Sequence, residues 1–121
     1  MATKIEKFED LEVWQNAVEL SYNVYQKFKT CKDFSFKDQI CRASVSVPSN
    51  IAEGFERQSN KEYIHFLYIS KASNGELRTQ LLIGLKLKYL NEEDYLFLLM
   101  QSKKISAQLF NLIKTRKEKF N

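Results

Sequence analysis

The spacing of the apolar residues is the feature that most constrains how this chain can fold. Over long stretches they recur at steps of three or four residues, which is the pattern of a helix with one buried face. Only three glycines and one proline occur in 121 residues, too few for the many turns of a β-sandwich or barrel. The sequence therefore predicts an all-α fold, and its length fits a single domain over residues 1–121.

Two helices are expected in the first half of the chain. The first is predicted over about Leu11–Lys29, with the carboxylate of Asp10 as its N-cap. Ser35 is the predicted N-cap of the second helix, with Asp38 at the third helical position and Phe34 packing onto the first turn. The break at residues 30–34 then forms the loop between the two helices.

Two more helices are expected in the second half. Ser59 and Glu62 form a capping box that opens a third helix, which is predicted to run to about Tyr89. Asn91 caps the fourth helix, which continues to the basic end of the chain. Gly54 is expected to end the second helix or to mark a close helix contact. Short connections between four helices predict an antiparallel up-down-up-down bundle.

Pro48 lies inside the second predicted helix. Its ring would clash with the carbonyl of Ser44 and remove one hydrogen bond, at a cost of about 3 kcal/mol in a regular helix. Either the helix is kinked there or it is two short helices. We favour the kink, because the apolar spacing of Val47, Ile51 and Phe55 continues in phase through the proline.

Most enzyme signatures are absent from the sequence. His65 is the only histidine, which excludes a His pair within one chain and favours a surface or interface role. Cys41 lies in a packed helix and is expected to act as a small apolar residue. The acidic residues 92–94 are explained by helix capping. No phosphate-binding loop or nucleophile elbow occurs, so we expect no enzyme, no cofactor and no metal.

The chain shows no sign of a membrane span or of export. Its longest apolar run, residues 95–100, is far shorter than the roughly 20 residues that cross a bilayer. The first residues lack the apolar core of a signal peptide. We therefore expect a cytoplasmic protein whose two cysteines stay reduced.

A polar layer is expected between the second and third helices. If they form a hairpin, Arg42 faces Glu76, and Ser46 faces Ser73. A buried Arg–Glu pair between small residues would fix the register of the two helices. The alternative is that a polar set lines a shared surface or pore in an oligomer: Arg42, Asn50 and Glu53.

Three blocks of the sequence resemble a known family. The central block, residues 39–54, reads QICRASVSVPSNIAEG, the opening block, residues 8–15, reads FEDLEVWQ, and the third, residues 66–81, reads FLYISKASNGELRTQL. They are similar to the four-helix-bundle proteins encoded in intervening sequences of bacterial large-subunit ribosomal RNA genes. The residues that carry this resemblance or the polar layer are Arg42, Ser46, Pro48, Asn50, Glu53, Gly54, Ser73 and Glu76.

The resemblance implies a function as well as a fold. The same superfamily resembles the accessory proteins of diversity-generating retroelements, which are homopentamers that bind nucleic acid and a reverse transcriptase. It implies a four-helix bundle, a homopentamer and no established catalytic activity. Two positions depart from the pattern: Gly75 stands where a helix-favouring small residue is expected, and Cys41 stands where a second basic residue is common.

Two functions are compatible with these features. The first is an oligomer without enzymatic activity that binds RNA or a ribonucleoprotein, because residues 61–121 hold eleven Lys and Arg against six acidic residues. The second is a protein-interaction scaffold, because apolar residues of the third helix cover more than one face. The candidate phosphate-binding residues are Lys86, Lys88, Lys103, Lys104, Lys114, Arg116, Lys117 and Lys119. A solvated helix end, favoured by the helix dipole, explains the basic C-terminal residues equally well without the family resemblance.

Overall fold

Four α-helices account for most of residues 4–120, the part of the chain that the computed structural model describes. This confirms the predicted all-α four-helix fold. A short 3₁₀ helix precedes the first of them. The elements are η1 (Phe8–Asp10), α1 (Glu12–Lys27), α2 (Phe34–Phe55), α3 (Asn60–Lys86) and α4 (Glu92–Lys119).

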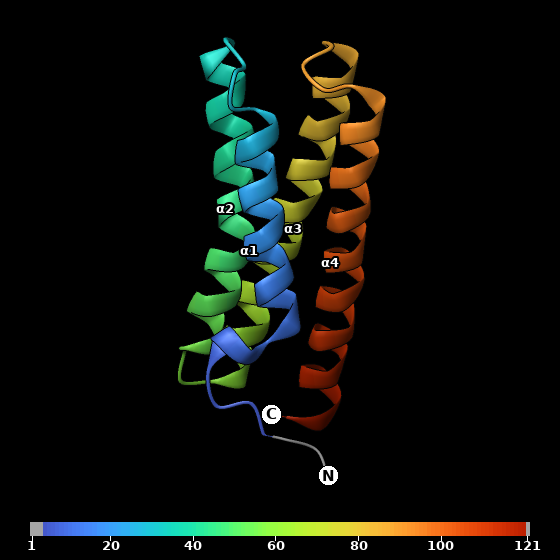
Figure 1. Cartoon of the computed structure of the whole chain (residues 1–121). Helices are drawn as coiled ribbons and strands as arrows, with labels where there is room; N and C mark the ends of the chain where they lie inside the picture. The colour runs from blue at the N-terminus through green and yellow to red at the C-terminus, as the bar shows by residue number, and fades with distance from the viewer. Residues whose placement is uncertain (1–3, 121) are drawn as a thin grey trace.

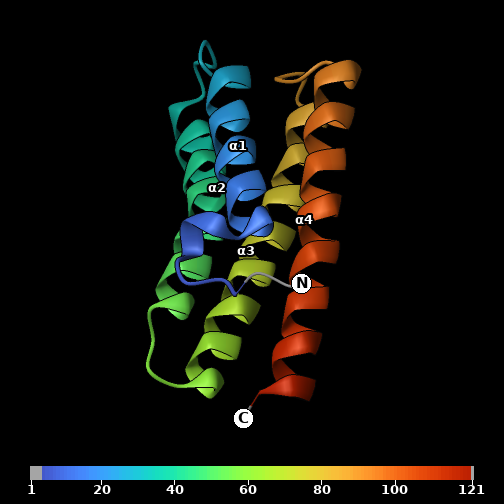
Figure 2. The same cartoon turned by 60° about the horizontal axis from the view of Figure 1, so that its bottom comes forward.

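The helices stand side by side around one core, and successive helices are joined at alternate ends of the bundle (Figure 1). Each helix packs against its two neighbours in the ring α1–α2–α3–α4. Asn16 contacts Gln108, and Asn23, further along α1, contacts Gln101, which is earlier in α4. α1 and α4 therefore run in opposite directions. Figure 2 shows the α2–α3 loop at the same end of the bundle as the end of α4.

Two of the predicted helix starts are confirmed. The Ser59 hydroxyl accepts a hydrogen bond from the backbone N–H of Glu62 at 3.1 Å. The side chain of Asn91 accepts one from the backbone N–H of Asp94 at 2.7 Å. Both caps satisfy amide groups that have no partner within the helix.

The other two helix starts differ from the prediction. Asp10 belongs to η1 and caps nothing, and Leu11 precedes α1 without a side-chain cap. Asp33, not Ser35, caps α2: its carboxylate accepts a hydrogen bond from the backbone N–H of Phe36 at 3.1 Å. Phe34 is exposed and does not act as a staple. Asp33, two residues before the expected cap, takes this role, and its carboxylate also accepts a hydrogen bond from Tyr89 in the α3–α4 loop.

Asp33 and Tyr89 join the two loops at the upper end of the bundle in Figure 1. The Tyr89 hydroxyl donates a hydrogen bond to the Asp33 carboxylate at 2.7 Å. This bond, followed by the bond from the Phe36 N–H, lowers the pKa of Asp33. The α1–α2 and α3–α4 loops are therefore fastened to each other.

The end of α3 is also earlier than predicted, at Lys86 and not Tyr89. Lys88 takes a left-handed backbone conformation with φ 65°. The backbone N–H groups of Tyr89 and Leu90 then donate to the carbonyl of Gly84, at 2.9 and 3.3 Å. This turn satisfies a carbonyl at the end of α3 and reverses the chain toward α4.

α2 is one continuous helix through Pro48, so the alternative of two short helices is wrong. Pro48 itself is buried. The kink at this residue stays a prediction.

Small polar residues lie inside the bundle, mostly in pairs that connect neighbouring helices. Asn74 donates to the backbone carbonyl of Ser102 at 2.8 Å, and the Ser102 hydroxyl donates to the Asn74 carbonyl oxygen at 2.7 Å. Ser70 donates to the carbonyl of Val47 at 2.8 Å. We call this set the polar belt: Ser21, Ser44, Ser46, Ser70, Ser73, Asn74 and Ser102. Because buried polar groups need their partners, the belt favours a single register of the four helices.

Gly54 marks the close approach of α2 and α3. A Cβ atom at this position would lie 2.7 Å from the Cβ of Phe66 and 3.1 Å from the carbonyl of Tyr63. Both neighbours are fixed to the α3 backbone, so neither can move without moving the helix. The close-contact reading of Gly54 is therefore confirmed.

We expect Gly54→Ala to destabilise the protein, because the added methyl group would meet the Phe66 Cβ of α3 at 2.7 Å, shorter than real Cβ contacts essentially ever are. Overpacking of this kind costs about 1–3 kcal/mol. Gly75→Ala is the matched control, since nothing lies within 4 Å of its added Cβ. Alanine is the better helix former by up to about 1 kcal/mol, so this control should stabilise the protein. Urea denaturation at fixed protein concentration measures both changes, and equal effects of the two variants would contradict the close contact.

Candidate nucleic-acid interface

The predicted Arg42–Glu76 pair does not form. Arg42 is exposed and its Nε donates to the carboxylate of Asp38, one helical turn earlier, at 2.9 Å. Glu76 is also exposed, and it lines the same cavity of about 310 Å³ between α2 and α3 as Arg42 does. Arg42 pairs with Asp38 because the two lie one turn apart on the same helix and stay exposed, so the pair forms without removing either charge from water.

The serine contact of the same layer is confirmed. The hydroxyl groups of Ser46 and Ser73 lie 2.8 Å apart, which joins α2 to α3. Asn50 donates to the backbone carbonyl and the hydroxyl of Ser46, at 2.8 and 2.9 Å. Glu53 is exposed. Most of the residues between α2 and α3 that the sequence singled out therefore serve packing and register.

Arg116, one of the predicted phosphate-binding residues, is held by the protein itself. Its Nε donates to the side-chain oxygen of Asn60 at 2.7 Å, and Asn60 donates to the backbone carbonyl of Arg116 at 3.0 Å. The guanidinium also lies over the rings of Tyr63 and Phe120, at 4.9 and 3.7 Å from their centroids. Arg116 thus fastens the end of α4 to the start of α3.

Tyr63 lies beneath this arginine. Burial raises the pKa of Tyr63 to about 12, although the nearby charge of Arg116 acts in the opposite direction. The phenol is therefore neutral at physiological pH and acts as a packing surface for the cation.

A basic groove runs along the outer side of α3 and α4. Two hollows form it, of about 380 and 430 Å³, and they share Lys71 and Phe110. The cations that line it are Lys71, Arg78, Lys103, Lys114 and Lys117, against one carboxylate, Glu118. Among the described residues, 4–120, none of these five cations takes part in an ion pair. We call this feature the α3–α4 groove.

Aromatic side chains lie between these cations. Lys117 donates a hydrogen bond to the Tyr68 hydroxyl at 2.6 Å, and its Nζ lies 5.0 Å from the centre of that ring. Phe110 is 59% exposed. Within the described part of the chain it joins no aromatic or cation–π pair.

The structure places the eight predicted basic residues at different sites. Lys103, Lys114 and Lys117 line the α3–α4 groove. Lys104 lies on the side of α4 that faces α1, in a small hollow with Asn16. The remaining lysines are exposed near the ends of α3 and α4: Lys86, Lys88 and Lys119.

Sequence reasoning missed Lys71, Arg78 and Tyr68 as groove residues. Each is separated from the next by three or seven residues, which places all three on one side of α3. On α4, positions 103, 110, 114 and 117 follow the same kind of spacing. Comparing residues by helix face would have placed each set on one side of its helix, but how the two sides meet depends on the register of α3 against α4.

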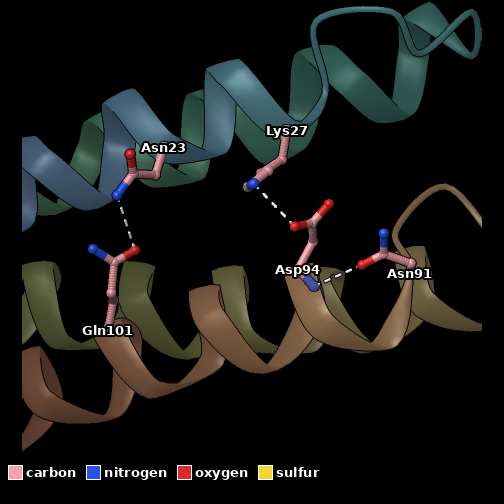
Figure 3. A network of polar contacts seen from close by, with 5 residues as sticks. All are labelled: Asn23, Lys27, Asn91, Asp94 and Gln101. Carbon is pink, nitrogen blue, oxygen red and sulfur yellow. Dashed lines mark hydrogen bonds and ion pairs between the residues drawn. The ribbon is translucent and has the colours of Figure 1, made fainter.

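The α1–α4 side is different, because polar side chains there are paired across the two helices. Figure 3 shows Lys27 directed at Asp94, with Nζ and carboxylate oxygen 2.9 Å apart, and Asn23 directed at Gln101, with nitrogen and oxygen 3.2 Å apart. Asp94 lies in the first turn of α4, capped by Asn91 (Figure 3). Charge on this side is therefore partly neutralised, in contrast to the α3–α4 groove.

The described residues hold no cluster of side chains suited to a metal. No group of three or more His, Cys, Asp or Glu side chains within residues 4–120 could hold an ion. His65 is exposed, with its ring against Phe66. Burial raises the pKa of the Cys41 thiol, which disfavours the reactive thiolate. None of the helices in this part of the chain is long and apolar enough to cross a membrane.

The fold defines the protein as an all-α four-helix bundle, with a groove between α3 and α4 that lysines and one arginine line. Residues 9–111 match the model of the 23S rRNA-intervening sequence protein family, and the chain belongs to that family. The resemblance of the three sequence blocks is therefore confirmed.

A solved structure supports the same assignment. The chain is similar to a protein of unknown function from the S23 ribosomal protein family of Bacteroides thetaiotaomicron, whose crystal structure was determined at 1.70 Å resolution. The two are 26% identical, with a TM-score of 0.80 over 85% of this chain and 99% of that one. No curated protein matches this chain significantly.

Proposed function

We propose that this protein binds RNA without enzymatic activity, through phosphate contacts in the α3–α4 groove. The observation that carries the proposal is the set of five groove cations that make no ion pair. Lysine and arginine side chains that neutralise phosphates release bound counterions, which drives binding independently of base sequence. Membership of a family named for ribosomal RNA intervening sequences makes RNA the nucleic acid to test first.

The proposal narrows the set of residues expected to touch RNA. Lys71, Lys114 and Lys117 surround one hollow and can approach neighbouring phosphates. Arg116 is occupied by Asn60, Tyr63 and Phe120, and we assign it a structural role.

We expect the triple variant Lys71→Gln, Lys114→Gln and Lys117→Gln to bind unrelated RNAs more weakly and to about the same extent. Each lost contact with a single strand removes about 0.7 from the slope of log affinity against log salt, so the slope should flatten by about 2. The matched control removes the same charge outside the groove: Lys86→Gln, Lys88→Gln and Lys104→Gln. Fluorescence anisotropy between 50 and 200 mM salt measures both. Equal losses in the two triple variants would show that net charge, not the groove, binds RNA.

We also propose that the protein assembles as a homo-oligomer, most simply the homopentamer that the sequence resemblance implies. Val18, Tyr22 and Tyr25 form an exposed stripe along α1, and Phe34 and Val45 are exposed on α2. These exposed apolar residues of α1 and α2 suit a contact with a second copy that leaves the α3–α4 groove open.

Light scattering is expected to give a stable species of about five times 14.3 kDa at micromolar concentration. Tyr22→Glu and Tyr25→Glu together should dissociate it, because they place charge in the contact surface. Gln58→Glu, at an exposed position of the α2–α3 loop, is the control and should leave the assembly intact. A wild-type protein that stays at 14.3 kDa would contradict the oligomer.

A scaffold function without nucleic acid is the alternative. The same exposed apolar residues favour it, because they suit a protein partner as well as a second copy. The scaffold function replaces the RNA-binding proposal if the wild-type protein forms the oligomer but binds no RNA at low salt.

A further inference from the structure

We infer that the α3–α4 groove takes single-stranded RNA in preference to duplex, with one unpaired base stacked on Phe110. This inference rests on the proposed RNA binding and names the form of RNA that the groove accepts. It depends on how aromatic and cationic side chains are combined in the hollow between α3 and α4.

Phe110 is the aromatic residue of the groove that is open to a ligand. Its side chain is 59% exposed, which leaves a large apolar surface in water. Tyr68, across the hollow, is already engaged by Lys117 through both its hydroxyl and its ring. Tyr68 therefore shapes the wall and holds the lysine, whereas Phe110 can accept a base.

The hollow has room for a base. Its volume is about 380 Å³, which lies within the range of pockets that bind small organic molecules. Phe110, Tyr68 and Ile113 supply apolar wall, and Lys71, Lys114 and Lys117 stand around it. An apolar floor with surrounding cations matches a nucleotide, whose flat base is joined to a charged phosphate.

A duplex can place its phosphates beside the groove lysines, but it cannot stack a base on Phe110. Its bases are stacked and paired, so they offer phosphates and groove edges but no free face to an aromatic ring. A single strand can turn one base onto Phe110 while its phosphates meet the lysines. Stacking of this kind is tolerant of sequence, because every base has a π-face.

The test compares a single-stranded RNA with a duplex of the same sequence, using Phe110→Leu, which removes the aromatic ring and keeps apolar bulk. We expect this variant to bind the single strand about 10-fold more weakly and to bind the duplex as the wild type does. The salt slope should not change, because no cation is lost. Phe97→Leu is the matched control, since Phe97 is an exposed phenylalanine of the same helix that lies beside Lys27 of α1. It should affect neither RNA.

Phe110→Trp gives an independent readout. It should retain single-strand affinity, and its emission should be quenched by the single strand but not by the duplex, because stacking on a base quenches the indole. Trp14, the one tryptophan of the natural sequence, provides the background signal, which the wild-type protein measures.

The outcomes separate this inference from the proposed function. If Phe110→Leu has no effect and both RNAs bind equally, while the groove lysine variant weakens both, RNA binding stands and base stacking is wrong. If the wild-type protein binds neither RNA at 50 mM salt, both are wrong.

Discussion

The contact between Asn74 and Ser102 is the constraint on which the rest of the bundle depends. The two residues bond to each other at a position with almost no solvent access: the Asn74 side chain donates to the backbone carbonyl of Ser102, and the Ser102 hydroxyl donates to the Asn74 amide oxygen. If α3 moved by one turn against α4, about 5.4 Å, both groups would lose their partners. An unpaired buried polar group costs about 1–3 kcal/mol, so this pair selects one register for α3 and α4.

That register is also what builds the α3–α4 groove. Lys71 is one turn before Asn74, and Lys103 directly follows Ser102. Lys71 and Lys103 line the same hollow as Phe110. A shift of one turn would therefore move the cations of α3 away from the aromatic residue of α4. A buried pair that carries no chemistry of its own thus positions the side chains proposed to bind RNA.

The sequence blocks that identify the family explain packing better than they explain function. Gly54 permits close approach of α2 to α3, Ser46 bonds to Ser73, and Asn50 bonds back to Ser46. Those residues face the α2–α3 contact. The third block, residues 66–81, also holds Tyr68, Lys71 and Arg78 of the α3–α4 groove. Recognising the family therefore predicts the bundle well and includes the α3 side of the proposed site, but not its α4 side.

What the sequence could predict follows from the range of each interaction. Four helices and the caps Ser59 and Asn91 were predictable because they depend on residues a few positions apart. The N-cap of α2 was misplaced because Asp33 is held partly by Tyr89, from a loop 56 residues away. Arg42 was assigned to Glu76 from the expected hairpin register, whereas its partner is Asp38, one turn earlier on the same helix.

The groove itself could be predicted only in part. Its α4 lysines were found from net charge, yet Lys71 and Tyr68 become relevant only once the register of α3 against α4 is known. Arg116 shows the opposite case: its charge suggested a phosphate contact, but Asn60 and two aromatic rings occupy it. Charge along a chain cannot distinguish a free cation from one that the fold already uses.

Photo-crosslinking to a single-stranded RNA that carries 4-thiouridine tests the central claim most directly, because mass spectrometry then locates the residues that touch the base. We expect the adducts on Phe110 or Tyr68 and on the α3 and α4 peptides around them, competed away by unlabelled single strand and lost as salt rises. Adducts confined to α1 and α2, or spread evenly over exposed lysines, would contradict an RNA site in the α3–α4 groove.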